Sequence, residues 1–132
     1  MELFSEEWAQ VYCRKLNGSE AYQKAAATWE GSLAFLLRAD PAMGVESPKA
    51  VVLDLWHGHC RGAKAASEEE AMAADFVIEG DLATWQEVLE GRAEPLVSLM
   101  RGELELKKGS LAALAPYVQA ARELVRVARE VL

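Results

Sequence analysis

Residues 75–109 read DFVIEGDLATWQEVLEGRAEPLVSLMRGELELKKG, and the order of local patterns in this stretch decides the fold. Phe76 and Ile78 alternate with their neighbours, as in a half-buried strand. Asp81 can then offer a side-chain oxygen to the free N–H groups at the start of a helix, and Gly91 can end that helix. The first part of the stretch therefore predicts a strand followed by a capped amphipathic helix.

The second part of the stretch predicts a shorter helix and another strand. Pro95 suits the first turn of a helix, because an N–H in that position has no intrahelical partner. Residues 103–107 alternate between charged and leucine side chains, which indicates a half-buried strand.

This succession resembles the C-terminal half of the sterol carrier protein 2 (SCP2) domain. There a strand ends in I-x-G-D, a helix carries a central Trp, and P-x-x-x-x-M-x-G-x-L-x-L-K-G follows. The residues that match are Ile78, Gly80, Asp81, Trp85, Leu89, Gly91, Pro95, Met100, Gly102, Leu104, Leu106, Lys107 and Gly109. In the first half, only SEEW near the start and LDLWHGHC in the middle resemble small stand-alone prokaryotic members of the family. The resemblance implies an α+β domain with an apolar tunnel for sterols, fatty acids or acyl-CoA, and no catalytic chemistry of its own.

The resemblance also implies which side chains surround such a tunnel. The apolar residues expected to line it are Phe35, Leu53, Leu55, Phe76, Ile78, Trp85, Leu89, Leu96, Met100, Leu104, Leu106 and Leu114. His57, His59 and Arg61 are candidates for binding a polar head group, since they stand near the predicted end of a strand. No residue is predicted to be catalytic, and no cofactor is expected.

The N-terminal half adds two helices and two strands to this framework. Ser5 and Ser19 are suitable caps for helices that run to Gly18 and towards Gly31. Strands at 33–38 and 51–56 are close enough to form an antiparallel hairpin, and residues 63–74 read as a solvated loop or short surface helix. We therefore predict one domain, residues 1–132, with a mostly antiparallel, curved sheet covered on one face by helices.

From Ser110 the chain is predicted to be helical to its end, with a break at Pro116. Apolar residues from Leu111 to Leu132 recur at steps of three and four and form a broad face. We expect this helix to dock on the sheet and to close one end of the cavity. The charged residues expected on its other side are Arg122, Glu123, Arg126, Arg129 and Glu130.

Charge and cysteine content narrow the function classes. The 132 residues carry a net charge of -7, which argues against nucleic acid and against stable association with anionic membranes. The sequence has no apolar run of the ~20 residues that span a bilayer, and no basic leader. Cys13 and Cys60 are far apart and form no CxxC motif, so we expect free thiols in the cytoplasm.

His57, His59 and Cys60 form the one group of side chains in the sequence that could bind a metal or act in catalysis. On a strand the two histidines would share a face and Cys60 would lie on the other, although a bulge at Gly58 would bring the thiol round. Structural zinc needs four ligands, and no partner cluster of His or Cys exists elsewhere. We therefore expect no metal site.

We therefore predict that the protein is a non-catalytic carrier of an aliphatic lipid. A fatty acid or fatty acyl-CoA is favoured over a sterol-like ligand. Burial of methylene groups supplies the binding free energy in such a carrier. The alternative is an accessory module that pairs with a partner enzyme, or with itself as a homodimer, through its C-terminal helix or a sheet edge.

Overall fold

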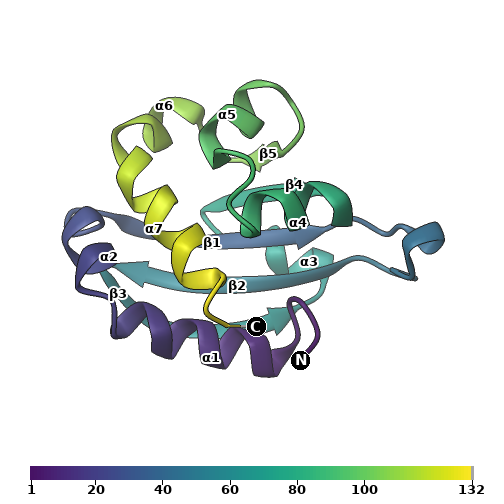
Figure 1. The fold of residues 1–132 in the computed structure, drawn as a ribbon, viewed down its shortest axis with the longest axis horizontal. Coiled ribbons are helices and arrows are strands. Elements are labelled where there is room, and N and C mark those ends of the chain that lie inside the picture. The colour runs from purple at the N-terminus through teal and green to yellow at the C-terminus, as the bar shows by residue number, and fades with distance from the viewer. Residues whose placement is uncertain (132) are drawn as a thin grey trace.

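Five strands form one sheet in the order β3-β2-β1-β4-β5 in the computed structural model, which describes residues 1–131 (Figure 1). β1 and β4 are parallel, and the other neighbouring strands are antiparallel. The elements are α1 (Glu6–Asn17), α2 (Glu20–Ala25), β1 (Glu30–Leu37), η1 (Pro41–Met43), β2 (Lys49–Trp56), β3 (His59–Ala66), α3 (Glu68–Ala71), β4 (Phe76–Gly80), α4 (Leu82–Leu89), α5 (Pro95–Met100), β5 (Glu105–Lys108), α6 (Leu111–Leu114), η2 (Ala115–Tyr117) and α7 (Val118–Ala128). The predicted α+β class with a mostly antiparallel sheet is confirmed.

The two faces of the sheet are covered unequally. Leu33 and Phe35 of β1 belong to the main core, which the sheet shares with α1, α2, α4 and α7. Ala34 and Leu36 point to the opposite face, where they pack with Ala71 of α3. In Figure 1, α3 lies behind the sheet, while α4 and α7 lie in front of it. The larger core therefore lies on the α4–α7 side of the sheet.

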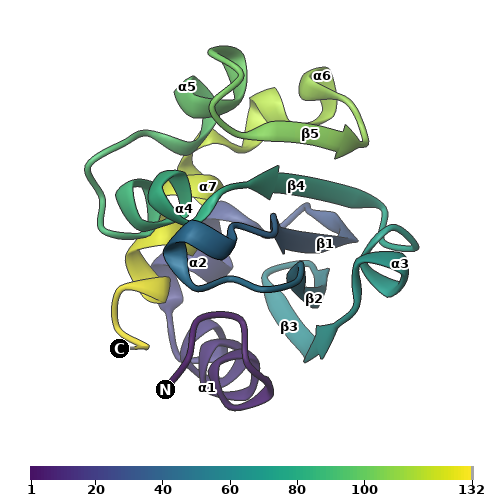
Figure 2. The same cartoon turned by 90° about the vertical axis from the view of Figure 1, so that its right-hand side faces the viewer.

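The predicted β1–β2 hairpin is confirmed, but the sequence did not reveal that the sheet continues into a third strand. Residues 63–74 were expected to be a loop or short surface helix, whereas β3 extends through Ala66 before the short helix α3 begins. β3 is an edge strand in which half of the residues are exposed and most are small, so it has little of the β-branched and aromatic content that marks a strand. Figure 2 shows β3 next to α1 at one edge, with β5 next to α5 and α6 at the other.

The C-terminal segment packs on the rest of the molecule, but chiefly on other helices and not on the sheet as expected. The chain breaks near Pro116, where η2 separates α6 from α7, and α7 packs against α1, α2, α4 and α5. Glu123 was expected on the solvent side of this helix, but it is buried and accepts a hydrogen bond from Nε of Arg126 at 2.8 Å. Leu132, the last residue of the predicted apolar face, lies outside the described residues.

Candidate ligand-binding cavity

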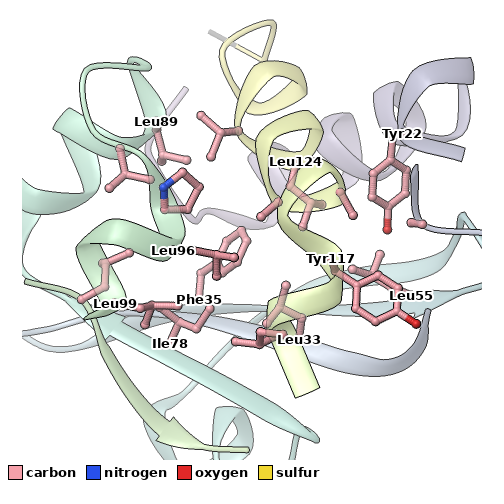
Figure 3. A pocket seen from close by; sticks show the side chains of 18 of the residues that line it. Tyr22, Leu33, Phe35, Leu55, Ile78, Leu89, Leu96, Leu99, Tyr117 and Leu124 are labelled. Carbon is pink, nitrogen blue, oxygen red and sulfur yellow. The ribbon is translucent and has the colours of Figure 1, made fainter. Parts of the chain in front are cut away.

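A cavity of about 80 Å³ lies between the sheet and the helices α2, α4, α5 and α7. Figure 3 shows apolar side chains from the sheet, from α4–α5 and from α7 pointing into the same space. Its walls are formed by Tyr12, Tyr22, Ala26, Trp29, Leu33, Phe35, Leu55, Ile78, Trp85, Val88, Leu89, Pro95, Leu96, Leu99, Leu104, Leu114, Tyr117, Ala120, Ala121, Leu124 and Val125. Within residues 1–131, no charged side chain belongs to this wall.

Eight of the twelve residues predicted to line the tunnel are part of this wall, and their role in binding remains a prediction. The eight are Phe35, Leu55, Ile78, Trp85, Leu89, Leu96, Leu104 and Leu114. Leu53, Phe76 and Leu106 lie outside the wall. Met100 is 70% exposed, so the expectation that it faces the cavity is wrong. Five of the six residues of α5 are apolar, so its periodicity could not show which side faces inward.

The strand register and a glycine position the floor of the cavity. Parallel pairing of β1 with β4 places Phe35 opposite Ile78, and both belong to the wall. Trp85 of α4 donates from Nε1 to the Leu36 carbonyl at 3.0 Å. A Cβ atom at Gly80 would lie 2.7 Å from Cδ2 of Leu104 and 3.3 Å from that indole nitrogen, so a side chain at this position would force both neighbours to shift.

Asp81 sets the start of α4, as the sequence predicts. Its Oδ1 accepts a hydrogen bond from the Thr84 backbone N–H at 2.8 Å. This bond stabilises the carboxylate and lowers the pKa of Asp81 below its usual value. The cap fixes the start of α4 about one turn before Trp85 and about two turns before Val88, both of which line the cavity.

Two buried tyrosines, Tyr12 and Tyr22, contribute aromatic rings to the cavity wall and add no charge to it. The Tyr12 hydroxyl donates to the Leu124 carbonyl at 2.7 Å and so joins α1 to α7. Burial raises the pKa of Tyr12 well above its usual value and raises that of Tyr22 to about 12. Both phenols are therefore neutral at physiological pH. The sequence analysis did not name either residue as part of the wall.

The sequence analysis also missed wall residues from the segment before β1, from η2 and from α7. Trp29, before β1, packs edge-to-face on Tyr117 of η2, with ring centroids 4.9 Å apart. At another part of the wall Phe35 and Trp85 lie 5.1 Å apart. The apolar periodicity of α7 correctly predicted docking, but it gave no way to tell which of its residues fill the core and which border the cavity.

The half-buried wall residues show where the cavity approaches solvent. Leu96 and Leu99 on α5 are half-buried, as are Leu124 and Val125 on α7, whereas the wall residues of the sheet are buried. We call the boundary between α5 and α7, where these four residues lie, the mouth.

The proposed head-group residues lie elsewhere, around the turn between β2 and β3. His57 and Gly58 have positive φ angles of 48° and 84° and form a two-residue turn, so His57 is not on a strand as expected. His57 Nε2 lies 2.6 Å from Glu30 Oε2, and Arg61 pairs with Asp54 at 3.0 Å. His57, His59 and Arg61 are exposed, and none belongs to the cavity wall.

The expectation of two free thiols is wrong. Cys13 on α1 and Cys60 on β3 form a disulfide, with Cα atoms 5.5 Å apart. Asn17 holds the same junction together, since its side chain bonds both the N–H and the carbonyl of Cys60 at 2.8 Å. Among residues 1–131 no group of three or more His, Cys, Asp or Glu side chains is arranged to hold a metal.

Comparison with known proteins identifies the family. A family model described as the SCP-2 sterol transfer family matches residues 9–116. The chain belongs to this family. A crystal structure of sterol carrier protein 2 has 73% identity and a TM-score of 0.92, with 99% of this chain and 100% of that chain covered. A solution structure from Thermus thermophilus, described as possibly a sterol carrier protein, has 73% identity and a TM-score of 0.90, with 99% of this chain and 90% of that chain covered.

More distant SCP-2 structures share the fold. The sterol carrier protein 2 of Aedes aegypti, solved as a complex with palmitate, has 16% identity and a TM-score of 0.53, with 91% of this chain and 98% of that chain covered. No curated protein gives a significant sequence match. In the described part of the chain, no helix has the length and apolar character needed to cross a membrane.

Proposed function

We propose that this SCP-2 family protein binds one acyl chain, as a fatty acid or fatty acyl ester, and carries it without chemical change. The observation that carries the proposal is a cavity whose wall contains only apolar residues and tyrosines. Each methylene transferred from water contributes about 0.8 kcal/mol. About fifteen buried methylenes would contribute about 12 kcal/mol, which leaves about 8 kcal/mol, or micromolar affinity, after an association cost of about 4 kcal/mol. Palmitate in the Aedes aegypti protein of the same fold supports an acyl ligand.

The size of the cavity implies that binding requires movement of its wall. A cavity of about 150 Å³ holds benzene, whereas this cavity measures about 80 Å³. A long acyl chain therefore enters only if α5 and α7 separate at the mouth. A flexible chain can enter through such a gap progressively, which favours it over a rigid sterol ring system.

The alternative of an interaction module finds less support. Its proposed surface was the apolar face of the C-terminal helix, and α7 uses that face to pack on α1, α2, α4 and α5.

A cavity-filling substitution tests the proposal. Ala121 is half-buried on α7 and borders the cavity, so Ala121→Leu would place three more carbons where the ligand must lie. Ala83→Leu is the matched control, because Ala83 is exposed on α4. We expect Ala121→Leu to weaken the binding of a fluorescent stearate about tenfold or more, equivalent to about 1.4 kcal/mol, while both variants melt like the parent.

Native mass spectrometry of the purified parent provides a second readout, namely a retained mass in the range of a fatty acid. A parent that neither retains lipid nor binds the fluorescent stearate would contradict the proposal. Equal affinity of Ala121→Leu and the parent would show that the ligand binds elsewhere.

A further inference from the structure

Two tryptophans and three tyrosines supply the polar side-chain atoms of the cavity wall that residues 1–131 form. Both indole N–H groups donate to backbone carbonyls, at 2.9 and 3.0 Å. The Tyr12 hydroxyl donates to a carbonyl at 2.7 Å, and the Tyr117 hydroxyl lies 3.0 Å from Oγ1 of the exposed Thr28. The Tyr22 hydroxyl, in contrast, forms no hydrogen bond with any of the described residues, and Tyr22 bonds only through its backbone.

Tyr22 places this free hydroxyl at the inner end of the cavity. The residue is 1% exposed on α2. Figure 3 shows its ring pointing inward from α2, with the hydroxyl directed toward the sheet. Leu99, which borders the mouth, lies on the opposite side of the cavity in the same view. Because burial raises the pKa of Tyr22 to about 12, the phenol is a neutral hydrogen-bond donor at physiological pH.

A buried hydroxyl without a partner indicates that something else binds there, because burial removes its hydrogen bonds to water. A trapped water molecule needs about two to four polar partners. Tyr22 offers one, and the other polar side-chain atoms of the described wall already have theirs. A lipid oxygen needs only the one donor, since the rest of the lipid packs against apolar side chains. The site therefore suits a ligand oxygen better than a water molecule.

The lack of charge around Tyr22 determines what kind of oxygen can bind. Among residues 1–131, no charged side chain belongs to the wall. An ionised carboxylate buried without a cation is strongly disfavoured, and one neutral phenol does not compensate for its lost hydration. A carboxylate should therefore stay in water at the mouth, whereas a neutral carbonyl can reach the inner end.

We propose that Tyr22 determines ligand specificity, by donating a hydrogen bond to the carbonyl oxygen of a neutral acyl ester whose alkyl chain extends toward the mouth. This inference rests on the proposed function and narrows its ligand to esters with a small alcohol group. The alcohol group must be small because Tyr22, Ala26 and Leu55 are each 1% exposed and leave no opening to solvent beside the hydroxyl.

Competition against a fluorescent stearate tests the proposal with two ligands of the same chain length, methyl dodecanoate and dodecanoate, at about pH 8, where the acid is ionised. We expect Tyr22→Phe to bind the ester about fivefold or more weakly than the parent, and to bind dodecanoate within about twofold of the parent. Thr28→Val is the control, because it removes an exposed hydroxyl that lies outside the cavity wall. This variant should match the parent with both ligands.

Equal affinity of the parent and Tyr22→Phe for the ester would overturn the inference, as would an equal loss of affinity for dodecanoate. A parent that binds stearate and dodecanoate but not the ester would overturn the inference alone. A parent that binds none of the three ligands would overturn the proposed function and the inference together.

A second measurement separates ligand binding by Tyr22 from a structural role. Without ligand, Tyr22→Phe should melt at or above the temperature of the parent, because it removes a buried hydroxyl that has no partner. Saturating methyl dodecanoate should then raise the melting temperature of the parent more than that of the variant. A ligand-free variant that melts below the parent would show that the hydroxyl has a partner within the folded protein, and would overturn the proposal.

Discussion

Nε of Arg122 on α7 lies 3.2 Å from Oε2 of Glu94, the residue immediately before α5, so an ion pair connects the two helices that border the cavity mouth. Both partners are substantially exposed, with side-chain exposures of 54% and 33%. An exposed pair of this kind contributes at most about 1 kcal/mol. That is little for the folded state as a whole, but it acts directly on the separation of α5 and α7.

Arg122→Ala should therefore speed ligand uptake with little change in stability. Removal of at most about 1 kcal/mol from the barrier raises the uptake rate up to about fivefold. Stopped-flow fluorescence with a labelled fatty acid measures this rate. Arg61→Ala is the control, because Arg61 forms a similarly exposed pair with Asp54 away from the cavity. Added salt should accelerate the parent more than Arg122→Ala. Slower uptake by Arg122→Ala would instead indicate that the guanidinium attracts the ligand carboxylate.

The Cys13–Cys60 disulfide should contribute measurably to stability. It closes a loop with a sequence separation of 47 residues, for which the chain-entropy relation gives about 4 kcal/mol. Cys13→Ser with Cys60→Ser should unfold at a lower denaturant concentration than the oxidised parent, and the parent in reductant should behave like the variant. Thiol titration of the unfolded, unreduced parent should detect no free thiol. Two reactive thiols, with unchanged stability in reductant, would contradict the bond.

The elements predicted correctly are those whose signals are local in the sequence. Asp81 caps α4, Pro95 begins α5, and Pro116 interrupts the C-terminal helix, because each residue acts through its own backbone geometry or one nearby hydrogen bond. The alternation of Phe76 with Ile78 likewise gave β4 its correct core-facing side.

The features that sequence did not predict depend on contacts between distant segments. Cys60 meets Cys13 only because β3 joins the edge of the sheet beside α1, and β3 itself has a weak strand pattern. Met100 was placed in the cavity because it matches a motif position, but the docking angle of α5 decides which residues face inward. That angle is set by packing against α7, which a six-residue apolar segment does not encode locally.

The Asp81 cap should give stability a specific pH dependence. Its folded-state pKa is lowered chiefly by the Thr84 backbone N–H, so its contribution is present above the unfolded pKa of about 4 and is lost as the pH falls through the folded value. Asp81→Ala should cost about 1 kcal/mol at about pH 7, with a smaller difference at about pH 2–3. Asp81→Asn should retain most of the cap at both values.

Urea unfolding at the two pH values measures the Asp81 effect. Glu87→Ala on the same helix controls for loss of an acidic residue, since Glu87 is exposed and forms no ion pair within residues 1–131. If Asp81→Ala lowers the free energy of unfolding by the same amount at both pH values, the carboxylate charge does not contribute through the cap.

A buried charge on α7 tests whether this helix is docked on the core in solution. Val127 is 1% exposed, so Val127→Asp would bury a carboxylate without a partner and should cost several kcal/mol. Gln119→Asp is the control, because Gln119 is exposed on the same helix and the variant should melt like the parent. Thermal melting measures the loss of stability, and light scattering measures the mass. If the parent were a dimer joined through α7, Val127→Asp would instead give a monomer of parental stability, and the docked arrangement that closes the cavity would be wrong.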